Sequence, residues 1–287
     1  MQRNAQNRSI DDTSENPSIR WFHRNADQEL KGIALIIHGL NLRPEKMESI
    51  IAILTGMGVD ALNVSLRGHG QNYSQQDGSN DAQARLNAFK SVSYDLWREE
   101  IYAAYNIAKI RSTQNGIPLF FVGFSFGALM GVDLLASRPD VEFDRMVLFA
   151  PGLKIHSRYQ IVRILAPFPG LTVPSFAIKS YRANDGTPIA AYNALLDSLE
   201  HLDHNLNSKI NVPALIFIDK KDEFVSYDEL KKLVENENLD RWKFHEVKKE
   251  AGGEPGKIHH LIIDEASTGQ DAWREITDVM VEHLLDP

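Results

Sequence analysis

A serine at the centre of the segment Gly123-Phe124-Ser125-Phe126-Gly127 is the feature that most restricts the fold of this chain. An apolar run over residues 119–122 precedes the segment, and a second apolar stretch covers residues 128–135. A strand that turns sharply into a helix is crowded at the turn, and two glycines around the serine relieve the crowding. The helix start supplies N–H groups that favour developing negative charge. The pattern predicts Ser125 as a nucleophile, although glycine-rich turns between strand and helix also occur in nucleotide-binding folds.

Strand and helix signals alternate along most of the chain. The expected strands cover residues 18–23, 32–37, 59–65, 119–122, 145–150, 213–219 and 241–247. The expected helices cover residues 44–57, 94–110, 128–135, 188–202 and 272–285. Continuous apolar runs such as residues 32–37 are typical of strands buried on both faces. The alternation therefore predicts an α/β fold with a mostly parallel central sheet and helices on both faces.

Residues 151–211 interrupt this alternation and are too many for an ordinary connection. We interpret them as a cap inserted over the carboxyl ends of the strands, within a single domain that spans residues 19–287. Residues 1–18 are polar and are expected to form a flexible tail. The cap is rich in apolar side chains, which either select an apolar acyl or alcohol group or pack the cap onto the core. These side chains are Ile161, Ile164, Leu165, Phe168, Leu171 and Phe176.

Composition excludes several classes of function. The formal net charge of −8 argues against nucleic acid as a partner. The chain has no cysteine, which excludes disulfides, zinc–thiolate sites and a cysteine nucleophile. No apolar run reaches the length of about 18 residues that a membrane span requires. We expect no transmembrane segment and a cytoplasmic location, and a transient contact with a membrane surface remains open.

A second local pattern, His38-Gly39-Leu40, comes directly after the buried run over residues 32–37. In acyl transfer, the oxyanion is held by the N–H group of the residue after the nucleophile and by an N–H group from a loop after an earlier strand. These donors would be the N–H groups of Phe126 and Leu40. The alternative is that His38-Gly39-Leu40 is a plain turn at the end of a strand.

Two further segments supply an acid and a base. Asp222 lies in a polar loop after the strand expected at residues 213–219 and is the candidate that orients a histidine, with Asp219 as its competitor. His259 and His260 lie after the last expected strand, and one of them would act as the general base. A metal site built on the paired histidines is the alternative for this segment.

Together these segments resemble the α/β-hydrolases, most closely the branch of the monoacylglycerol lipases and lysophospholipases. The resemblance rests on three segments: the serine turn at residues 123–127, called the elbow below, His38-Gly39-Leu40, and Leu66-Arg67-Gly68-His69-Gly70. Ser65 stands where the branch usually has aspartate. The acid loop of that branch resembles G-x-x-D, which Asp222 completes. Its histidine segment resembles H-E-L-L-N-E, which is matched better by the frame that starts at His260. The resemblance therefore implies the α/β-hydrolase fold and a triad of Ser125, Asp222 and His260.

The implied function is a serine hydrolase that cleaves carboxylic esters, lipid-like or acyl, through an acyl-enzyme. The substrate would be a small-molecule ester, and the chemistry needs no metal and no organic cofactor. Three alternatives stay open: a thioesterase or acyltransferase, a peptidase similar to proline iminopeptidases, and a non-catalytic binding module. An epoxide hydrolase or dehalogenase would need a carboxylate in place of Ser125.

Overall fold

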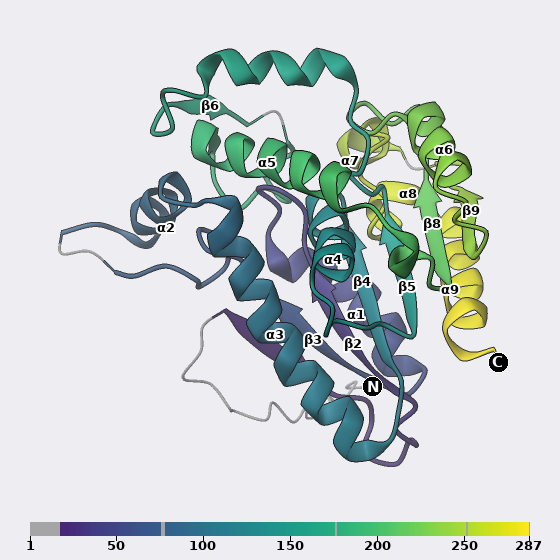
Figure 1. The fold of residues 1–287 in the computed structure, drawn as a ribbon. Helices are drawn as coiled ribbons and strands as arrows, with labels where there is room; N and C mark the ends of the chain where they lie inside the picture. The colour runs from purple at the N-terminus through teal and green to yellow at the C-terminus, as the bar shows by residue number, and fades with distance from the viewer. Residues whose placement is uncertain (1–17, 76–77, 176, 251, 287) are drawn as a thin grey trace.

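A mixed, mostly parallel sheet lies at the centre of the computed structural model, which describes residues 18–75, 78–175, 177–250 and 252–286 (Figure 1). Its strands follow the order β1-β3-β2-β4-β5-β8-β9. β1 pairs antiparallel with β3 at one edge, and the other pairs are parallel. The strands are β1 (Ile19–Phe22), β2 (Gly32–Ile37), β3 (Val59–Val64), β4 (Leu119–Phe124), β5 (Arg145–Phe149), β8 (Ala214–Ile218) and β9 (Trp242–Glu246).

Helices cover both faces of this sheet. On one face lie α3, α4 and α6, and on the other lie α1 and α9. The helices are η1 (Pro44–Met47), α1 (Glu48–Gly56), α2 (Asp81–Lys90), α3 (Tyr94–Asn115), α4 (Phe126–Ser137), η2 (Ser157–Leu165), α5 (Ile189–Asn205), η3 (Ser208–Ile210), α6 (Tyr227–Asn236), α7 (Gly253–Lys257), α8 (Glu265–Thr268) and α9 (Gln270–Leu285). The arrangement confirms the predicted α/β-hydrolase fold.

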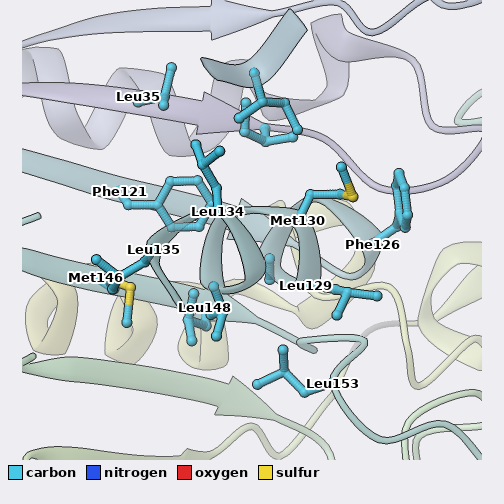
Figure 2. Close-up of a cluster of buried hydrophobic side chains, with 14 of the residues drawn as sticks. Leu35, Phe121, Phe126, Leu129, Met130, Leu134, Leu135, Met146, Leu148 and Leu153 are labelled. Atoms are coloured by element: carbon cyan, nitrogen blue, oxygen red, sulfur yellow. The ribbon is translucent and has the colours of Figure 1, made fainter. Parts of the chain in front are cut away.

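The apolar run of β2 is explained by this double coverage. Leu35 belongs to the core under α3 and α4, whereas its neighbour Ile36 belongs to the core under α1 and α9. Helix α4 is itself buried along its whole apolar stretch. Figure 2 shows its side chains Leu129 and Met130 in the core that also contains Phe121 of β4. Each such side chain contributes about 1.5–3 kcal/mol on burial, so the helix that follows Ser125 is firmly held.

The segment between β5 and β8 contains η2, α5 and a small antiparallel pair formed by β6 (Thr172–Pro174) and β7 (Gly186–Pro188). Figure 1 shows η2, β6 and α5 stacked on one side of the molecule, beyond the start of α4. Two isolated bridges tie this segment to loops of the sheet. They pair Leu42 with Arg182 and Ile155 with Val225. Its interpretation as a cap stays a prediction.

The apolar side chains predicted in this segment do not all pack onto the core. Ile161, Ile164, Phe168 and Leu171 are 71%, 73%, 64% and 50% exposed. For Ile161, Ile164 and Phe168, the interpretation as plain packing is wrong, because most of each side chain is exposed; Leu171 is half buried. Leu165 is partly buried. Phe176, like residues 1–17 of the predicted tail, lies outside the described residues.

Among the described residues, no helix combines the length and the apolar character needed to cross a membrane.

Candidate active site

Ser125 occupies the sharp turn between β4 and α4, with φ 55° and ψ −116°. A non-glycine residue adopts such a backbone only when its surroundings enforce it, at a cost on the order of 1–3 kcal/mol. Gly123 and Gly127, the glycines predicted to relieve the crowding at the turn, lie where there is no room for a Cβ atom. A Cβ atom at Gly123 would lie 2.5 Å from the Cα atom of Ala128, and one at Gly127 would lie 2.3 Å from the carbonyl oxygen of Ile37. The turn therefore accepts no side chain at either position.

Ser125, His260 and Asp222 lie in one chain of hydrogen bonds. Ser125 Oγ is 2.7 Å from His260 Nε2, and His260 Nδ1 is 2.8 Å from Asp222 Oδ2. The three residues come from the start of α4, the loop between α7 and α8, and the loop between β8 and α6. With its proton on Nδ1, His260 donates to Asp222 and leaves Nε2 free to accept the serine proton. The structure thus brings together the three residues predicted from the sequence.

The Asp222 carboxylate is held in its ionised form. Burial of the group favours the neutral acid, but the charge and hydrogen bond of His260 act against burial, as do hydrogen bonds from two backbone N–H groups. Those N–H groups belong to Phe224 and Val225, and each lies 2.8 Å from Asp222 Oδ1. The net effect lowers the pKa of Asp222 below its ordinary value. The carboxylate can therefore orient the imidazole and balance its charge when it is protonated.

Asp219 and His259, the competitors from the sequence, form a second pair beside the first. His259 Nδ1 lies 2.6 Å from Asp219 Oδ2, and the His259 side chain is 31% exposed. The first pair is more deeply buried, because the His260 ring lies between the rings of Phe124 and Phe224, at centroid distances of 5.1 Å and 5.0 Å. The geometry therefore favours His260 as the partner of Ser125.

The two predicted oxyanion donors border the serine. Phe126 is the first residue of α4, and the first N–H groups of a helix have no partner within it. Leu40 follows Gly39, where an added Cβ atom would lie 3.3 Å from Ser125 Cβ, so this loop runs against the nucleophile. Within the described part of the chain, neither the N–H group of Leu40 nor that of Phe126 donates to a protein atom. Both are therefore available to a ligand.

Two buried histidines shape the loop that carries Leu40, a role that the sequence did not predict. His38 Nε2 accepts the N–H group of Leu66 at 3.2 Å, and His69 Nε2 accepts that of Asn41 at 3.1 Å. Burial lowers the pKa of His38 to about 4 and takes that of His69 well below its ordinary value. Both rings are therefore neutral at pH 7 and can accept. The signal was present, because both histidines lie in the motifs that carried the family resemblance.

Asn41 connects the same loop to the segment between β5 and β8. Its backbone has a φ of 54°, and its side chain is buried. Asn41 Oδ1 accepts the N–H group of Asn184 at 2.9 Å, and Asn41 Nδ2 donates to Asn184 O at 3.0 Å and to Thr187 Oγ1 at 3.1 Å. No sequence motif pointed to this network.

In the described residues, no group of three or more histidine, aspartate or glutamate side chains is placed to hold a metal ion. His259 and His260 each pair with an aspartate of their own. The arrangement thus gives no support to the metal site weighed for the paired histidines.

The chain is similar to one known protein family and to several solved structures. The sequence model of the family described as serine aminopeptidase, S33, matches residues 28–187, more than half of the chain. A search of curated proteins gave no significant match. Among solved structures, a soluble variant of monoglyceride lipase from Saccharomyces cerevisiae has 13% identity and a TM-score of 0.72, over 93% of this chain and 89% of that chain.

Two further structures are similar over nearly their whole length. One, from work on the metagenome-derived lipolytic enzymes LipS and LipT, has 16% identity and a TM-score of 0.69, over 93% of this chain and 97% of that chain. The other, the monoacylglycerol lipase of Paleococcus ferrophilus, has 18% identity and a TM-score of 0.62, over 92% of this chain and 98% of that chain. At these identities, the likeness establishes the fold.

Proposed function

Because the chain belongs to the serine aminopeptidase S33 family and has the α/β-hydrolase fold, we propose that it is a serine hydrolase that cleaves carboxylic esters. The observation that carries the proposal is the hydrogen-bond chain from Asp222 through His260 to Ser125. A nucleophile, a base and an orienting acid in this contact are the parts that acyl transfer requires.

In the proposed reaction, His260 Nε2 takes the proton of Ser125 Oγ as the oxygen attacks the ester carbonyl carbon. The carbonyl oxygen becomes an oxyanion that accepts hydrogen bonds from the N–H groups of Leu40 and Phe126, each contributing about 3 kcal/mol to the transition state. The imidazolium, stabilised by Asp222, then protonates the leaving alkoxide, and an acyl-enzyme remains. Water attacks the acyl carbonyl with His260 again as base, which releases the acid and restores Ser125.

For the substrate, we propose an ester with an apolar, lipid-like acyl group, admitted under a cap formed by residues 151–211. The solved monoglyceride lipases share this fold, which supports the lipid-like class. The exposed side chains of Ile161, Ile164 and Phe168 supply apolar surface on the same segment. Exposed apolar patches mark surfaces that contact other apolar phases. They support a transient contact with a micelle or membrane surface from which such a substrate is drawn.

The test is active-site labelling with a fluorophosphonate, combined with hydrolysis of p-nitrophenyl esters. Wild type should be labelled once and should hydrolyse the esters. Ser125→Ala should lose both reactions and keep the circular dichroism spectrum and melting temperature of wild type, because a partly exposed hydroxyl contributes little packing. Labelling that persists in Ser125→Ala would contradict the assignment of the nucleophile.

The description of the matched family also favours a second candidate, a peptidase similar to proline iminopeptidases. Both activities would use the same triad, so only the substrate separates them. Release of p-nitroaniline from prolyl p-nitroanilide that is faster than hydrolysis of p-nitrophenyl butyrate would favour the peptidase. The opposite order would favour the esterase.

A further inference from the structure

The loop that carries His260 is held from both sides of its backbone by two charged side chains outside the triad. Lys249 lies after β9 and reaches the carbonyl side of the loop, and Glu223 lies beside Asp222 and reaches the N–H side. Both side chains are partly buried.

Lys249 gathers three carbonyl groups around one ammonium. Its Nζ donates to the carbonyl oxygens of Pro255, Ile258 and Leu261 at 3.2 Å, 2.5 Å and 2.8 Å. An ammonium has three N–H bonds, so its donors match these acceptors one to one. The acceptors lie in α7 and on both sides of His260. Lys249 thereby fixes the path of the backbone into and out of the catalytic position.

Glu223 binds the same loop from the opposite direction. Its Oε1 accepts the N–H group of His259, and its Oε2 accepts that of His260, both at 2.9 Å. Hydrogen bonds to a charged carboxylate are stronger than neutral ones. Because Asp222 is the adjacent residue, one short loop holds both the backbone and the ring of His260.

We propose that Lys249 and Glu223 are positioning residues that clamp the histidine loop and hold His260 Nε2 at Ser125 Oγ. The proposal rests on the serine hydrolase function proposed above. Neither residue touches the reacting atoms, so each acts through the placement of His260. A displacement of a reacting group by about 1 Å can lower the rate by about 10²-fold.

The clamp contains a group that titrates in an accessible range. Burial lowers the pKa of Lys249 to about 8, against the opposing charges of Asp219, Glu223, Asp264 and Asp222. His259 and His260 face the same site, and both are paired with aspartates. A neutral amine keeps two N–H bonds and gains a lone pair, so above about pH 8 one carbonyl loses its donor. The clamp should therefore weaken, and kcat should fall, on the alkaline side.

Global unfolding driven by this lysine cannot produce that fall. Its pKa in the folded protein is below the ordinary value, so the unfolded chain binds the proton more tightly. The contribution of this group to the free energy of unfolding therefore rises with pH between about 8 and the ordinary lysine value. Loss of activity without loss of melting temperature is the signature of the clamp.

The experiment measures kcat and KM for a p-nitrophenyl ester between about pH 6 and pH 10, with active enzyme counted by fluorophosphonate titration. This range includes the ordinary pKa of histidine and ends just below that of lysine. Wild type should lose kcat with a midpoint near pH 8. Lys249→Arg keeps a charged donor throughout, so its alkaline loss should disappear. Lys249→Met has no titrating group there and should show kcat lower by about 10²-fold at pH 7, without that alkaline loss and with little change in KM.

Lys248 is the matched control, because it is the neighbouring lysine and is exposed. Lys248→Met should keep the kcat and the pH profile of wild type. Glu223→Gln should lower kcat, because its amide presents N–H bonds to a backbone N–H group. An alkaline loss near pH 8 that persists in both Lys249 variants would overturn the proposal, as would a Lys249→Met variant with the kcat of wild type. A wild type that neither labels nor hydrolyses any ester would instead refute the proposed function.

Discussion

Replacement of Asp222 by asparagine should nearly abolish activity, and the structure gives the reason in atomic detail. Asp222 Oδ1 accepts the N–H groups of Phe224 and Val225 at 2.8 Å each. An asparagine at this position must keep its carbonyl oxygen there, since an NH₂ group would face two donors. Its NH₂ group then points at His260 Nδ1, whose N–H group donates a hydrogen bond to Asp222 Oδ2 in the native protein.

The consequence is a change of tautomer. His260 Nδ1 becomes an acceptor, the proton moves to Nε2, and Nε2 can no longer accept the proton of Ser125. In a well-studied triad of this kind, the equivalent change lowers kcat on the order of 10⁴-fold. That factor corresponds to about 5 kcal/mol of lost transition-state stabilisation. We expect a loss of the same order here, with KM little changed.

Asp219→Asn is the matched control, because it makes the same substitution in the neighbouring aspartate–histidine pair. His259 pairs with Asp219 and makes no contact with Ser125 among the described hydrogen bonds, so kcat should stay close to that of wild type. Both variants would be assayed on p-nitrophenyl butyrate, with melting temperatures measured in parallel. Equal losses in the two variants, or a greater loss in Asp219→Asn, would refute the assignment of the acid.

Three further predictions test the elbow and the proposed cap. Gly127→Ala should fail to accumulate as folded protein, measured as soluble yield and melting temperature, because its Cβ atom would lie 2.3 Å from a backbone oxygen; a wild-type melting temperature would contradict this. Along a series of p-nitrophenyl esters, kcat/KM should rise several-fold per methylene beyond butyryl, since each buried methylene contributes about 0.8 kcal/mol; a maximum at acetyl would contradict an apolar acyl site. The double variant Ile164→Ser, Phe168→Ser should lose activity on emulsified esters and keep it on soluble ones, and equal effects would argue against surface contact.

The sheet was predictable because helices cover both of its faces. Strands such as β2 and β8 have apolar side chains on both faces, and such runs stand out against polar loops. Helix α2 was not predicted, because only Ala84 and Phe89 are buried on it. Two buried positions are too few to show the spacing of apolar residues that is typical of a helix. Of the two alternatives for the apolar side chains of residues 151–211, packing onto the core does not hold at Ile161 and Ile164, since composition cannot tell which face of a segment is covered.

The site was predictable in its chemistry more than in its pairing. The loops contain two aspartates and two histidines, and the sequence alone does not say which aspartate pairs with which histidine. In the structure, each aspartate pairs with one histidine. The distance to Ser125 separates the pairs, and that distance depends on how β4, β8 and the histidine loop meet. Lys249 and Glu223 were not predicted, for a different reason. Their partners are backbone groups, which carry no residue-specific signal in the sequence.

The hydrogen bonds of Asn41 also limit which foreign segments this chain could accept in place of residues 151–211. A segment transplanted in place of residues 151–211 would bring its own groups to positions 184 and 187, where Asn41 now finds a carbonyl, an N–H group and a hydroxyl. Asn41 is buried, so a donor or acceptor left unpaired there would cost about 1–3 kcal/mol. The unpaired group would destabilise the turn that contains Leu40, the residue next to Asn41. A chimaera with a foreign segment would thus inherit a defect in catalysis as well as a new specificity, unless position 41 were changed with it.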